Sequence, residues 1–299
     1  MSVPATFEMS IDAQIGAFRQ SVAESAPELL DLFDVYANEA RFGRLLIQED
    51  LAGIPKDSKL IEIGGGMFLL GCLLQQTGYQ VSILEPLGEG FTHFADLQKI
   101  ILKHALGRNS APEILNIPVE SLSLKGIFTY AYSINVMEHV ASVPEAIIRV
   151  VTALKAGGKY RFICPNYSFP YEPHFNMPTL FSKRLTEKYF KEKILGNKKL
   201  HDPVGTWTSL NWITVGEVVK ISRQHSNFGV CFHTDLITRM FQRVAIDPDF
   251  AERRSPWMRQ LVRGITFLRL DALLKYLPAR CHPVMDCTLH KYGVNDSRN

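Results

Sequence analysis

The sequence is poor in cysteine. Its five cysteines, Cys72, Cys164, Cys231, Cys281 and Cys287, are scattered over 299 positions, and no two of them form C-x-x-C. An odd, dispersed set of this kind argues against a disulfide framework and against a structural zinc site. We therefore expect a cytoplasmic protein with reduced cysteines, and the sequence predicts no metal site.

An excess of charge of one sign, a signal peptide and a long apolar run are also missing. The 33 Lys and Arg against 30 Asp and Glu give a net charge of +3, too small to indicate a nucleic-acid partner. The N-terminal segment MSVPATFEMSIDAQ lacks the basic and apolar regions of a signal peptide. No apolar run approaches the roughly 18 residues that a transmembrane helix needs. We expect a soluble protein with one core of roughly 200–250 residues and an appended segment.

Glycine is concentrated where it carries information, in residues 60–86, which read LIEIGGGMFLLGCLLQQTGYQVSILEP. The pattern predicts a strand over 60–63, a helix over 67–77 and a strand over 81–84. Three glycines follow the first strand, and Glu85 ends the second. A β-α-β unit with glycines at its first crossover and a carboxylate about 20 residues further on is typical of a nucleoside site, because the carboxylate binds the ribose hydroxyls.

Two ligand classes fit this unit. A dinucleotide site uses G-x-G-x-x-G; Gly64 and Gly66 match its first two glycines, but Leu69 stands at the third. Glu62 directly precedes the glycines, where it would repel a pyrophosphate and suits a cationic ligand such as the ammonium of an amino acid. The pattern E-x-G-x-G, with Phe68 where a further glycine is typical, resembles the first motif of class I S-adenosylmethionine-dependent methyltransferases.

Strands and helices alternate beyond this unit and after a helical segment over residues 8–52. The next expected elements are helix 90–105, strand 113–117, strand 127–133, helix 143–155 and strand 159–164. This alternation predicts an α/β fold, a Rossmann-like doubly wound parallel sheet with helices on both faces. The carboxyl ends of its strands then meet at one edge, where ligands of such sheets bind.

Two more segments resemble the same methyltransferases in the same order. FTYAYSINVMEHV (128–140) resembles their fourth strand, and PEAIIRVVTALKAGGKYRFICPN (144–166) resembles the following helix, turn and fifth strand. The match covers residues 58–166 and is closest to the substrate-diverse type 11 or type 12 group. It implies a seven-stranded, mostly parallel sheet whose last strand is antiparallel.

We expect four regions along the chain. The last is expected to contain helix 234–241, strand 242–246, a helical stretch over 255–278 and a closing strand over 284–292. The regions are an N-terminal helical segment (1–57), a core that binds S-adenosylmethionine (58–165), an acceptor-binding insertion over the active edge (166–232) and a C-terminal completion of the sheet with basic amphipathic helices (233–299).

The resemblance implies a set of cofactor-binding residues. Glu62 would act on the methionine end, the glycines would allow close approach, Glu85 would accept hydrogen bonds from the ribose, and Val119 and Glu120 would contact the adenine. The full set is Glu62, Gly64, Gly65, Gly66, Glu85, Pro86, Val119, Glu120 and Asn135.

Methyl transfer is an in-line displacement at a carbon already activated by its sulfonium, so alignment is the main requirement. A base is needed where the acceptor must lose a proton. The candidates for catalysis or acceptor binding are Glu138 and His139, which follow the fourth strand, and Tyr167, Tyr171, Glu172 and His174, which follow the fifth. A capping or surface role for His139 and a structural role for His174 remain open.

The sequence thus predicts a methyltransferase that uses S-adenosylmethionine to methylate a small-molecule or glycan- or lipid-linked acceptor, with oxygen as the favoured acceptor atom and nitrogen and carbon left open. The alternatives are an NAD-linked oxidoreductase and a methyltransferase-like scaffold that has lost its cofactor; RNA methylation lacks a basic-aromatic patch. Peripheral contact with an anionic membrane is a further possibility, because cations alternate with apolar residues in the C-terminal helices. These cations are Arg253, Arg254, Arg259, Arg263, Arg269 and Lys275.

Overall fold

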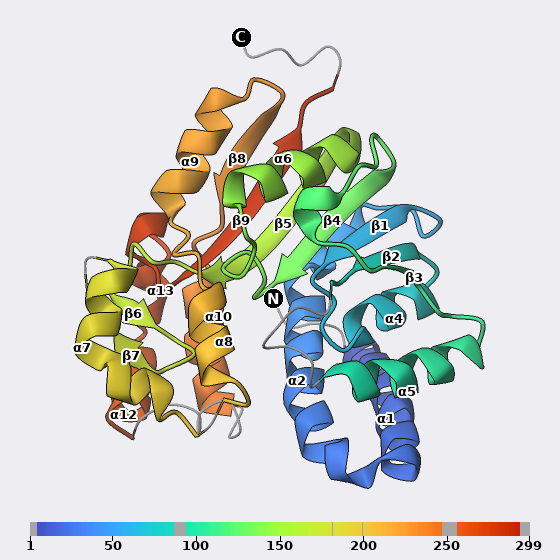
Figure 1. Cartoon of the computed structure of the whole chain (residues 1–299), viewed down its shortest axis with the longest axis horizontal. Coiled ribbons are helices and arrows are strands. Elements are labelled where there is room, and N and C mark those ends of the chain that lie inside the picture. The colour runs from blue at the N-terminus through green and yellow to red at the C-terminus, as the bar shows by residue number, and fades with distance from the viewer. Residues whose placement is uncertain (1–4, 87–93, 181, 199, 247–255, 294–299) are drawn as a thin grey trace.

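A computed structural model describes residues 5–86, 94–180, 182–198, 200–246 and 256–293. A seven-stranded sheet crosses the molecule in the order β3-β2-β1-β4-β5-β9-β8 (Figure 1). Its strands are β1 (Lys59–Ile63), β2 (Gln80–Leu84), β3 (Glu113–Leu115), β4 (Phe128–Ile134), β5 (Leu154–Pro165), β8 (Phe228–Phe232) and β9 (Val284–Lys291).

The strand directions confirm the predicted doubly wound sheet. Strands β1 to β5 pair in parallel, whereas β9 pairs antiparallel with both β5 and β8. The last strand is therefore the antiparallel one. Because β1, β2 and β4 run in the same direction, their carboxyl ends meet at one edge, and the loops that follow them lie close together.

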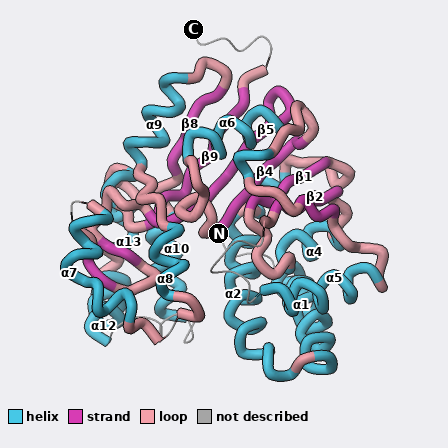
Figure 2. The backbone as a smooth tube through the Cα atoms, in the orientation of Figure 1, coloured by secondary structure: helices cyan, strands magenta, loops and turns pink. Residues whose placement is uncertain are grey.

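Helices cover both faces of the sheet (Figure 2). On one face, α6 (Val143–Ala153) packs on β5 and α9 (Val215–Gln224) packs on β8, and both helices belong to the core that contains Ile61 and Ile63 of β1. On the other face, Leu60 lies in a second core, formed with the early helices. This period-2 alternation places successive strand residues in opposite cores. The early helices are α1 (Ala5–Ser25), α2 (Leu30–Leu46), α4 (Leu69–Gln76) and α5 (Ala95–Leu106).

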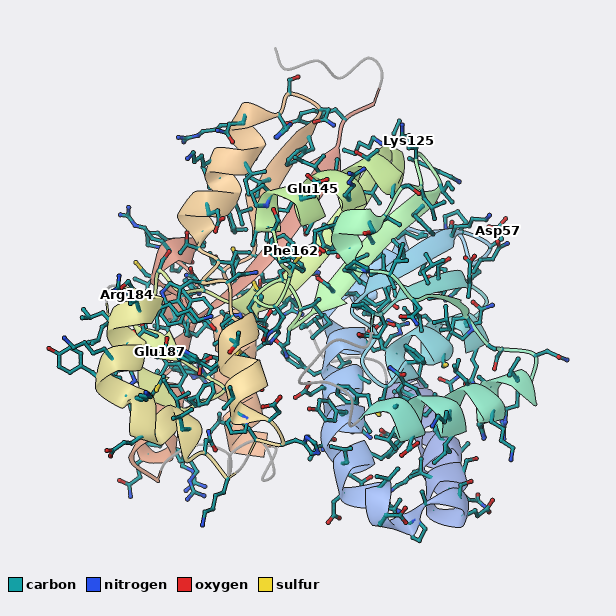
Figure 3. All side chains as sticks on the ribbon, viewed as in Figure 1. Asp57, Lys125, Glu145, Phe162, Arg184 and Glu187 are labelled. Atoms are coloured by element: carbon teal, nitrogen blue, oxygen red, sulfur yellow. The ribbon has the colours of Figure 1, made fainter. Side chains whose placement is uncertain are left out.

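Side chains follow this layering. Phe162 lies within the sheet and is fully buried, whereas Asp57 and Lys125 lie at the periphery (Figure 3). The prediction of a helical N-terminal segment is confirmed, with the short helix α3 (Gln48–Ala52) added before β1. Residues 90–93 of the predicted helix 90–105 lie outside the described residues.

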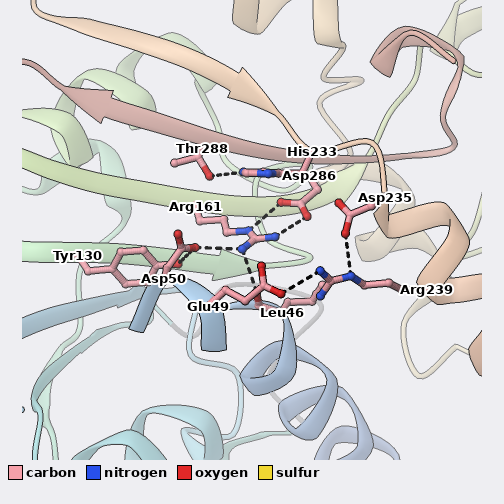
Figure 4. Close-up of polar contacts among 10 residues, drawn as sticks. All are labelled: Leu46, Glu49, Asp50, Tyr130, Arg161, His233, Asp235, Arg239, Asp286 and Thr288. Atoms are coloured by element: carbon pink, nitrogen blue, oxygen red, sulfur yellow. Dashed lines mark hydrogen bonds and ion pairs between the residues drawn. The ribbon is translucent and has the colours of Figure 1, made fainter. Parts of the chain in front are cut away.

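A buried ionic network joins the N-terminal helices to the sheet (Figure 4). Arg161 of β5 donates to both carboxylate oxygens of Asp286 on β9, at 2.9 and 2.8 Å. The same guanidinium donates to Asp50 of α3 at 3.0 Å and to the Leu46 carbonyl at 2.9 Å. The network fixes the end of α2 against the middle of the sheet.

The predicted strand 242–246 is wrong. Residues 236–246 form α10 (Leu236–Ile246), whose Leu236, Met240 and Val244 recur every four residues and pack inward. That spacing is helical, and it outweighs the β-branched residues at the end of the segment. The sheet is instead completed by β8, which lies within the segment predicted as insertion, so the sheet resumes before residue 233.

The insertion between β5 and α9 lies beyond the carboxyl ends of the central strands, at the lower left of Figure 1. It comprises a hairpin of β6 (Tyr171–Glu172) and β7 (Met177–Pro178), then α7 (Lys183–Leu195) and α8 (Pro203–Ser209). After α10 come α12 (Pro256–Phe267) and α13 (Asp271–Leu274). None of the helices in the described ranges is long and apolar enough to span a membrane. Arg253 and Arg254 lie outside the described residues.

Candidate functional site

A cavity of about 370 Å³ opens at the carboxyl ends of β1, β2 and β4. Its volume falls in the range of small-molecule and cofactor sites. Every residue predicted to bind the cofactor lines it: Glu62, Gly64, Gly65, Gly66, Glu85, Pro86, Val119, Glu120 and Asn135. The placement agrees with the prediction; the role of these residues in binding is taken up below.

The glycine loop after β1 requires its glycines. Gly64 has φ of +73°, and a Cβ there would collide with the side chain of Val136. Gly66 has φ of +51°, and its amide donates a 2.9 Å hydrogen bond to Oε2 of Glu85. Both residues occupy the left-handed region that L side chains rarely adopt. The loop is therefore closed against β2 and exposes bare backbone to the cavity.

Phe68 occupies the position of the further glycine in the typical motif. It has φ of +71° and precedes α4, so the backbone conformation that favours glycine is kept. Its side chain is 3% exposed and belongs to the core under α1, α2 and α4. Phe68 is absent from the residues that line the cavity. Phe68 in place of the typical glycine thus adds a side chain to the core and leaves the cavity open.

Glu62 is a buried carboxylate on the cavity wall. It is 5% exposed, and its Oε2 has no hydrogen-bond partner among the described residues. Burial raises its pKa to about 8, against the smaller lowering by Tyr132 and the Gly71 amide. A buried carboxylate without a partner is costly unless it is protonated or meets a cation. This wall of the cavity is therefore suited to a positively charged group.

The other predicted residues approach from the next two loops. Val119 begins a short 3-10 turn and is buried, and the Oε1 of neighbouring Glu120 accepts a hydrogen bond from the Ser142 amide at 3.0 Å. Asn135 follows β4 with φ of +56°, and its amide donates to the Ile163 carbonyl at 2.7 Å. Asparagine tolerates this left-handed conformation better than most residues.

Helix α2 contributes a wall that the sequence patterns did not indicate. Tyr36, Glu39 and Ala40 line the cavity together with the glycine loop. The ring of Tyr36 meets that of Phe94 edge-on, with centroids 4.5 Å apart. These residues precede the first motif by more than 20 positions, so only the fold brings them to it.

A cluster of imidazoles and carboxylates lies beside the cavity. His139, which lines the cavity, and His174 from the insertion have ring centroids 5.3 Å apart. The Nε2 atom of each lies 3.9 Å from Oε1 of Glu138. His174 Nδ1 lies 2.6 Å from Oε1 of Glu172. The predicted residues Glu138, His139, Glu172 and His174 therefore come together.

Burial and the neighbouring charged groups together set the pKa values in this cluster. Burial lowers the pKa of His139 to about 3, so this imidazole is neutral. For His174 burial also acts downward, but the hydrogen bond and the charge of Glu172 outweigh it and raise the pKa above the usual value. Burial raises the pKa of Glu138 to about 7, with His174 acting in the opposite direction.

The remaining predicted residues have other positions. Glu172 is fully buried, and beyond His174 its oxygens accept hydrogen bonds from the Tyr167 hydroxyl at 3.2 Å and the Phe175 amide at 2.7 Å. Glu172 thus fixes the orientation of the His174 ring through its Nδ1 atom. Tyr171 is not among the residues that line the cavity, and its hydroxyl donates to Oδ1 of Asn176 at 2.7 Å. The placement gives Tyr171 no support as a catalytic group.

Asn211, at the end of the insertion, holds the turn that carries Glu138 and His139. Its side-chain amide donates to the carbonyls of Met137 at 2.7 Å and Val140 at 2.8 Å, and its backbone amide donates to the Glu138 carbonyl at 2.8 Å. No local pattern marks Asn211, because its partners lie about 70 residues earlier in the chain.

Comparison with known proteins places the chain in a family. No protein-family model matches the chain. The Mycobacterium tuberculosis proteins Rv1509 (strain H37Rv) and MT1557 (strain CDC 1551) are each 42% identical to it over 281 residues, which cover 94% of this chain and 95% of theirs.

Solved structures show the fold. Two structures of Haemonchus contortus phosphoethanolamine N-methyltransferase 2, one with S-adenosyl-L-methionine and one with phosphomonomethylethanolamine and S-adenosylhomocysteine, superpose with TM-scores of 0.51 and 0.50 at 12% identity. The match covers 92% of this chain and 60% of that enzyme. The chain therefore belongs to the family of Mycobacterium tuberculosis Rv1509 and has the fold of the class I S-adenosylmethionine-dependent methyltransferases.

Proposed function

We propose that the protein is an S-adenosylmethionine-dependent methyltransferase that acts on oxygen of a small-molecule or glycan- or lipid-linked acceptor. The observation that carries the proposal is the pairing of two acids across one cavity. Glu62 offers a buried carboxylate whose Oε2 has no hydrogen-bond partner among the described residues, and Glu85 offers a carboxylate at the tip of the next strand. A ligand with a cationic amino-acid end and a ribose complements both.

The cofactor's orientation follows from these two residues. The methionine ammonium would lie against Glu62, and the ribose hydroxyls would donate to Glu85. The adenine would then reach Val119 and Glu120, which line the cavity beyond Glu85. Asn135 and His139 lie after β4, so the sulfonium methyl would face the imidazole cluster.

The reaction breaks the bond between sulfur and the methyl carbon and forms a bond from that carbon to the acceptor oxygen, while the hydroxyl proton leaves. S-adenosylmethionine supplies an activated methyl group, and the protein aligns donor and acceptor, which can contribute about 7–11 kcal/mol. With the cofactor in this orientation, the cluster of Glu138, His139 and His174 would lie on the acceptor side, where a hydroxyl must lose its proton.

The C-terminal helices support a lipid-linked acceptor. Between residues 259 and 280, all of them described, Phe267 is 87% exposed and Tyr276 is 75% exposed, and the single acidic residue, Asp271, is buried. The other exposed large apolar residues of this stretch are Leu261, Leu268, Leu270, Leu273 and Leu277, and its exposed cations are Arg263, Arg269, Lys275 and Arg280. Exposed apolar side chains in a stretch whose exposed charged residues are all cations fit the interface of an anionic bilayer.

Vesicle co-sedimentation tests the lipid contact. We expect binding to vesicles of phosphatidylglycerol and phosphatidylcholine, little binding to phosphatidylcholine alone, and loss of binding in Phe267→Ser combined with Arg263→Glu. The matched control is Arg149→Glu, which changes a half-exposed arginine on α6. Equal binding of all variants, or no binding to either vesicle, contradicts the membrane contact and leaves a soluble acceptor.

A calorimetric titration tests cofactor binding, which is the first step of the proposed activity. We expect micromolar binding of S-adenosylmethionine and no measurable binding of NAD. Binding of NAD instead would indicate a dehydrogenase. Absence of S-adenosylmethionine binding would support the scaffold that has lost its cofactor.

A further inference from the structure

Glu138 is the least satisfied charged group beside the cavity. Its side chain is fully buried, and neither carboxylate oxygen has a hydrogen-bond partner among the described residues. His139 and His174 both direct Nε2 toward the same oxygen, each at 3.9 Å. That separation is too long for a hydrogen bond and leaves a space between three potential ligand atoms.

The other nitrogen of each imidazole is held by a hydrogen bond. His174 Nδ1 donates to the buried carboxylate of Glu172 at 2.6 Å. His139 Nδ1 lies 2.8 Å from Ser209 Oγ, whose hydroxyl proton goes to the Thr206 carbonyl at 2.9 Å. Ser209 therefore accepts from His139, which makes Nδ1 the protonated nitrogen and places the lone pair on Nε2. Imidazoles fixed in this way by outer partners are characteristic of metal ligands.

We propose that Glu138, His139 and His174 bind one divalent transition-metal ion. One ligand atom from each residue lies within 4.8 Å of the other two. With two of these separations at 3.9 Å, a point equidistant from the three atoms lies about 2.5 Å or less from each, near the usual 2.0–2.2 Å of zinc-ligand bonds. Side-chain shifts of a few tenths of an ångström complete the geometry.

Two imidazoles and one carboxylate select the class of metal. This donor set suits Zn²⁺, Fe²⁺ or Co²⁺ more than Mg²⁺ or Ca²⁺, which prefer oxygen ligands alone. Three protein ligands leave at least one coordination position, as in catalytic zinc sites. His139 and Ser209 line the cavity, so that position lies on the cavity side.

The role of the ion rests on the proposed function. An acceptor hydroxyl bound to the ion would be more acidic and would be fixed in line with the sulfonium methyl. In that case the two Nε2 atoms act as ligands, and the cluster promotes loss of the acceptor proton through the ion. The acceptor would then present an oxygen atom able to bind a metal, such as a vicinal diol or an enol.

Cobalt titration of the chelator-treated full-length protein tests the site without any methyl acceptor. We expect one Co²⁺ per chain, visible d–d absorption and an increase in the melting temperature. Glu138→Gln and His139→Gln should each weaken binding by at least ~10-fold, and Glu172→Gln should weaken it by ~10-fold through His174. His201→Ala, which removes an exposed imidazole outside the cluster, should leave the affinity unchanged.

The result separates the metal site from the proposed activity, because S-adenosylmethionine binding is measured in parallel on the same metal-free protein. Absence of the cobalt spectrum, or affinities in Glu138→Gln and His139→Gln within threefold of the wild type, overturns the metal site even where the cofactor binds. An equal loss in His201→Ala identifies surface binding and also overturns it. Cobalt binding without cofactor binding supports the metal site and contradicts the activity.

Discussion

The Gly66 amide donates a 2.9 Å hydrogen bond to the Glu85 carboxylate, so the glycine loop and the acid of the second strand form one unit. One carboxylate oxygen fixes the loop. A carboxylate has about four acceptor sites, so Glu85 retains capacity for the ribose hydroxyls. This pairing prepares the cavity before a ligand arrives.

Neutralising Glu85 tests this unit. Glu85→Gln keeps the shape of the side chain but loses the charge-assisted hydrogen bonds to ribose. Because hydrogen bonds to a charged group are worth about 1.5–3 kcal/mol, we expect S-adenosylmethionine affinity to fall by about 10- to 100-fold in calorimetry. Glu145→Gln changes a half-exposed side chain on α6; it is the control and should leave the affinity unchanged.

The pH dependence of cofactor binding tests the role of Glu62. Its pKa of about 8 means that the empty cavity holds a protonated carboxyl at neutral pH. The cofactor's ammonium favours the ionised form, so binding below about pH 8 should release a proton, and affinity should rise as pH increases toward that value. Titration in buffers of different ionisation enthalpy measures the proton release. Glu62→Gln should bind more weakly and release no proton from this site; unchanged proton release in that variant contradicts the assignment.

The same carboxyl affects the stability of the ligand-free protein. In the unfolded chain Glu62 ionises near its ordinary pKa of 4.5, whereas in the folded chain it stays protonated up to about 8. Between these values the folded state binds the extra proton, so its contribution to stability falls as pH rises. Urea unfolding at about pH 5 and about pH 8 should show a smaller loss of stability in Glu62→Gln than in the wild type. Identical pH dependence in both would show that the carboxyl is not buried as described.

Variants of Phe68 should lower the stability of the protein without changing its affinity for S-adenosylmethionine. Replacing this buried ring by Ala should cost about 3–5 kcal/mol. Glycine removes the same ring but relieves the left-handed strain, so Phe68→Gly should be no less stable than Phe68→Ala, the reverse of the usual order in a helix. Both variants, where folded, should keep their S-adenosylmethionine affinity within a few-fold. A large loss of affinity in Phe68→Gly would show that the ring shapes the cavity.

Arg161 and Arg149 provide a matched pair for stability. Arg161→Met leaves the buried carboxylate of Asp286 without its partner, which should cost about 3–5 kcal/mol of unfolding free energy. Arg149→Met breaks a half-exposed pair with Glu145 and should cost about 1 kcal/mol or less. Urea denaturation measures both. Similar costs for the two variants would contradict a central role of the buried network.

Local sequence patterns predicted the parts of the fold whose residues lie close together along the chain. Glu62, the glycines and Glu85 fall within 24 consecutive residues of a single β-α-β unit, so spacing alone placed them together. The strand predicted over 242–246 is instead the end of α10, because the inward spacing of Leu236, Met240 and Val244 governs the whole segment. A short apolar run does not by itself distinguish a strand from a buried helix.

The acceptor side depends on contacts between distant segments. Glu138 is brought to His174 across 36 positions, and Asn211 reaches back about 70 residues to hold its turn. Tyr36 belongs to a helix that precedes the first motif and still forms a cavity wall. Such pairings follow from the way the insertion and α2 pack on the sheet, which no local period encodes.

A crystal structure grown with S-adenosylmethionine measures the central claim most directly. The account predicts density for the cofactor in the cavity, with the ammonium beside Glu62, the ribose on Glu85 and the methyl group toward His139. A different ligand orientation, or a cavity that the cofactor does not enter, would contradict the assignment of these residues and with it the proposed methyltransferase.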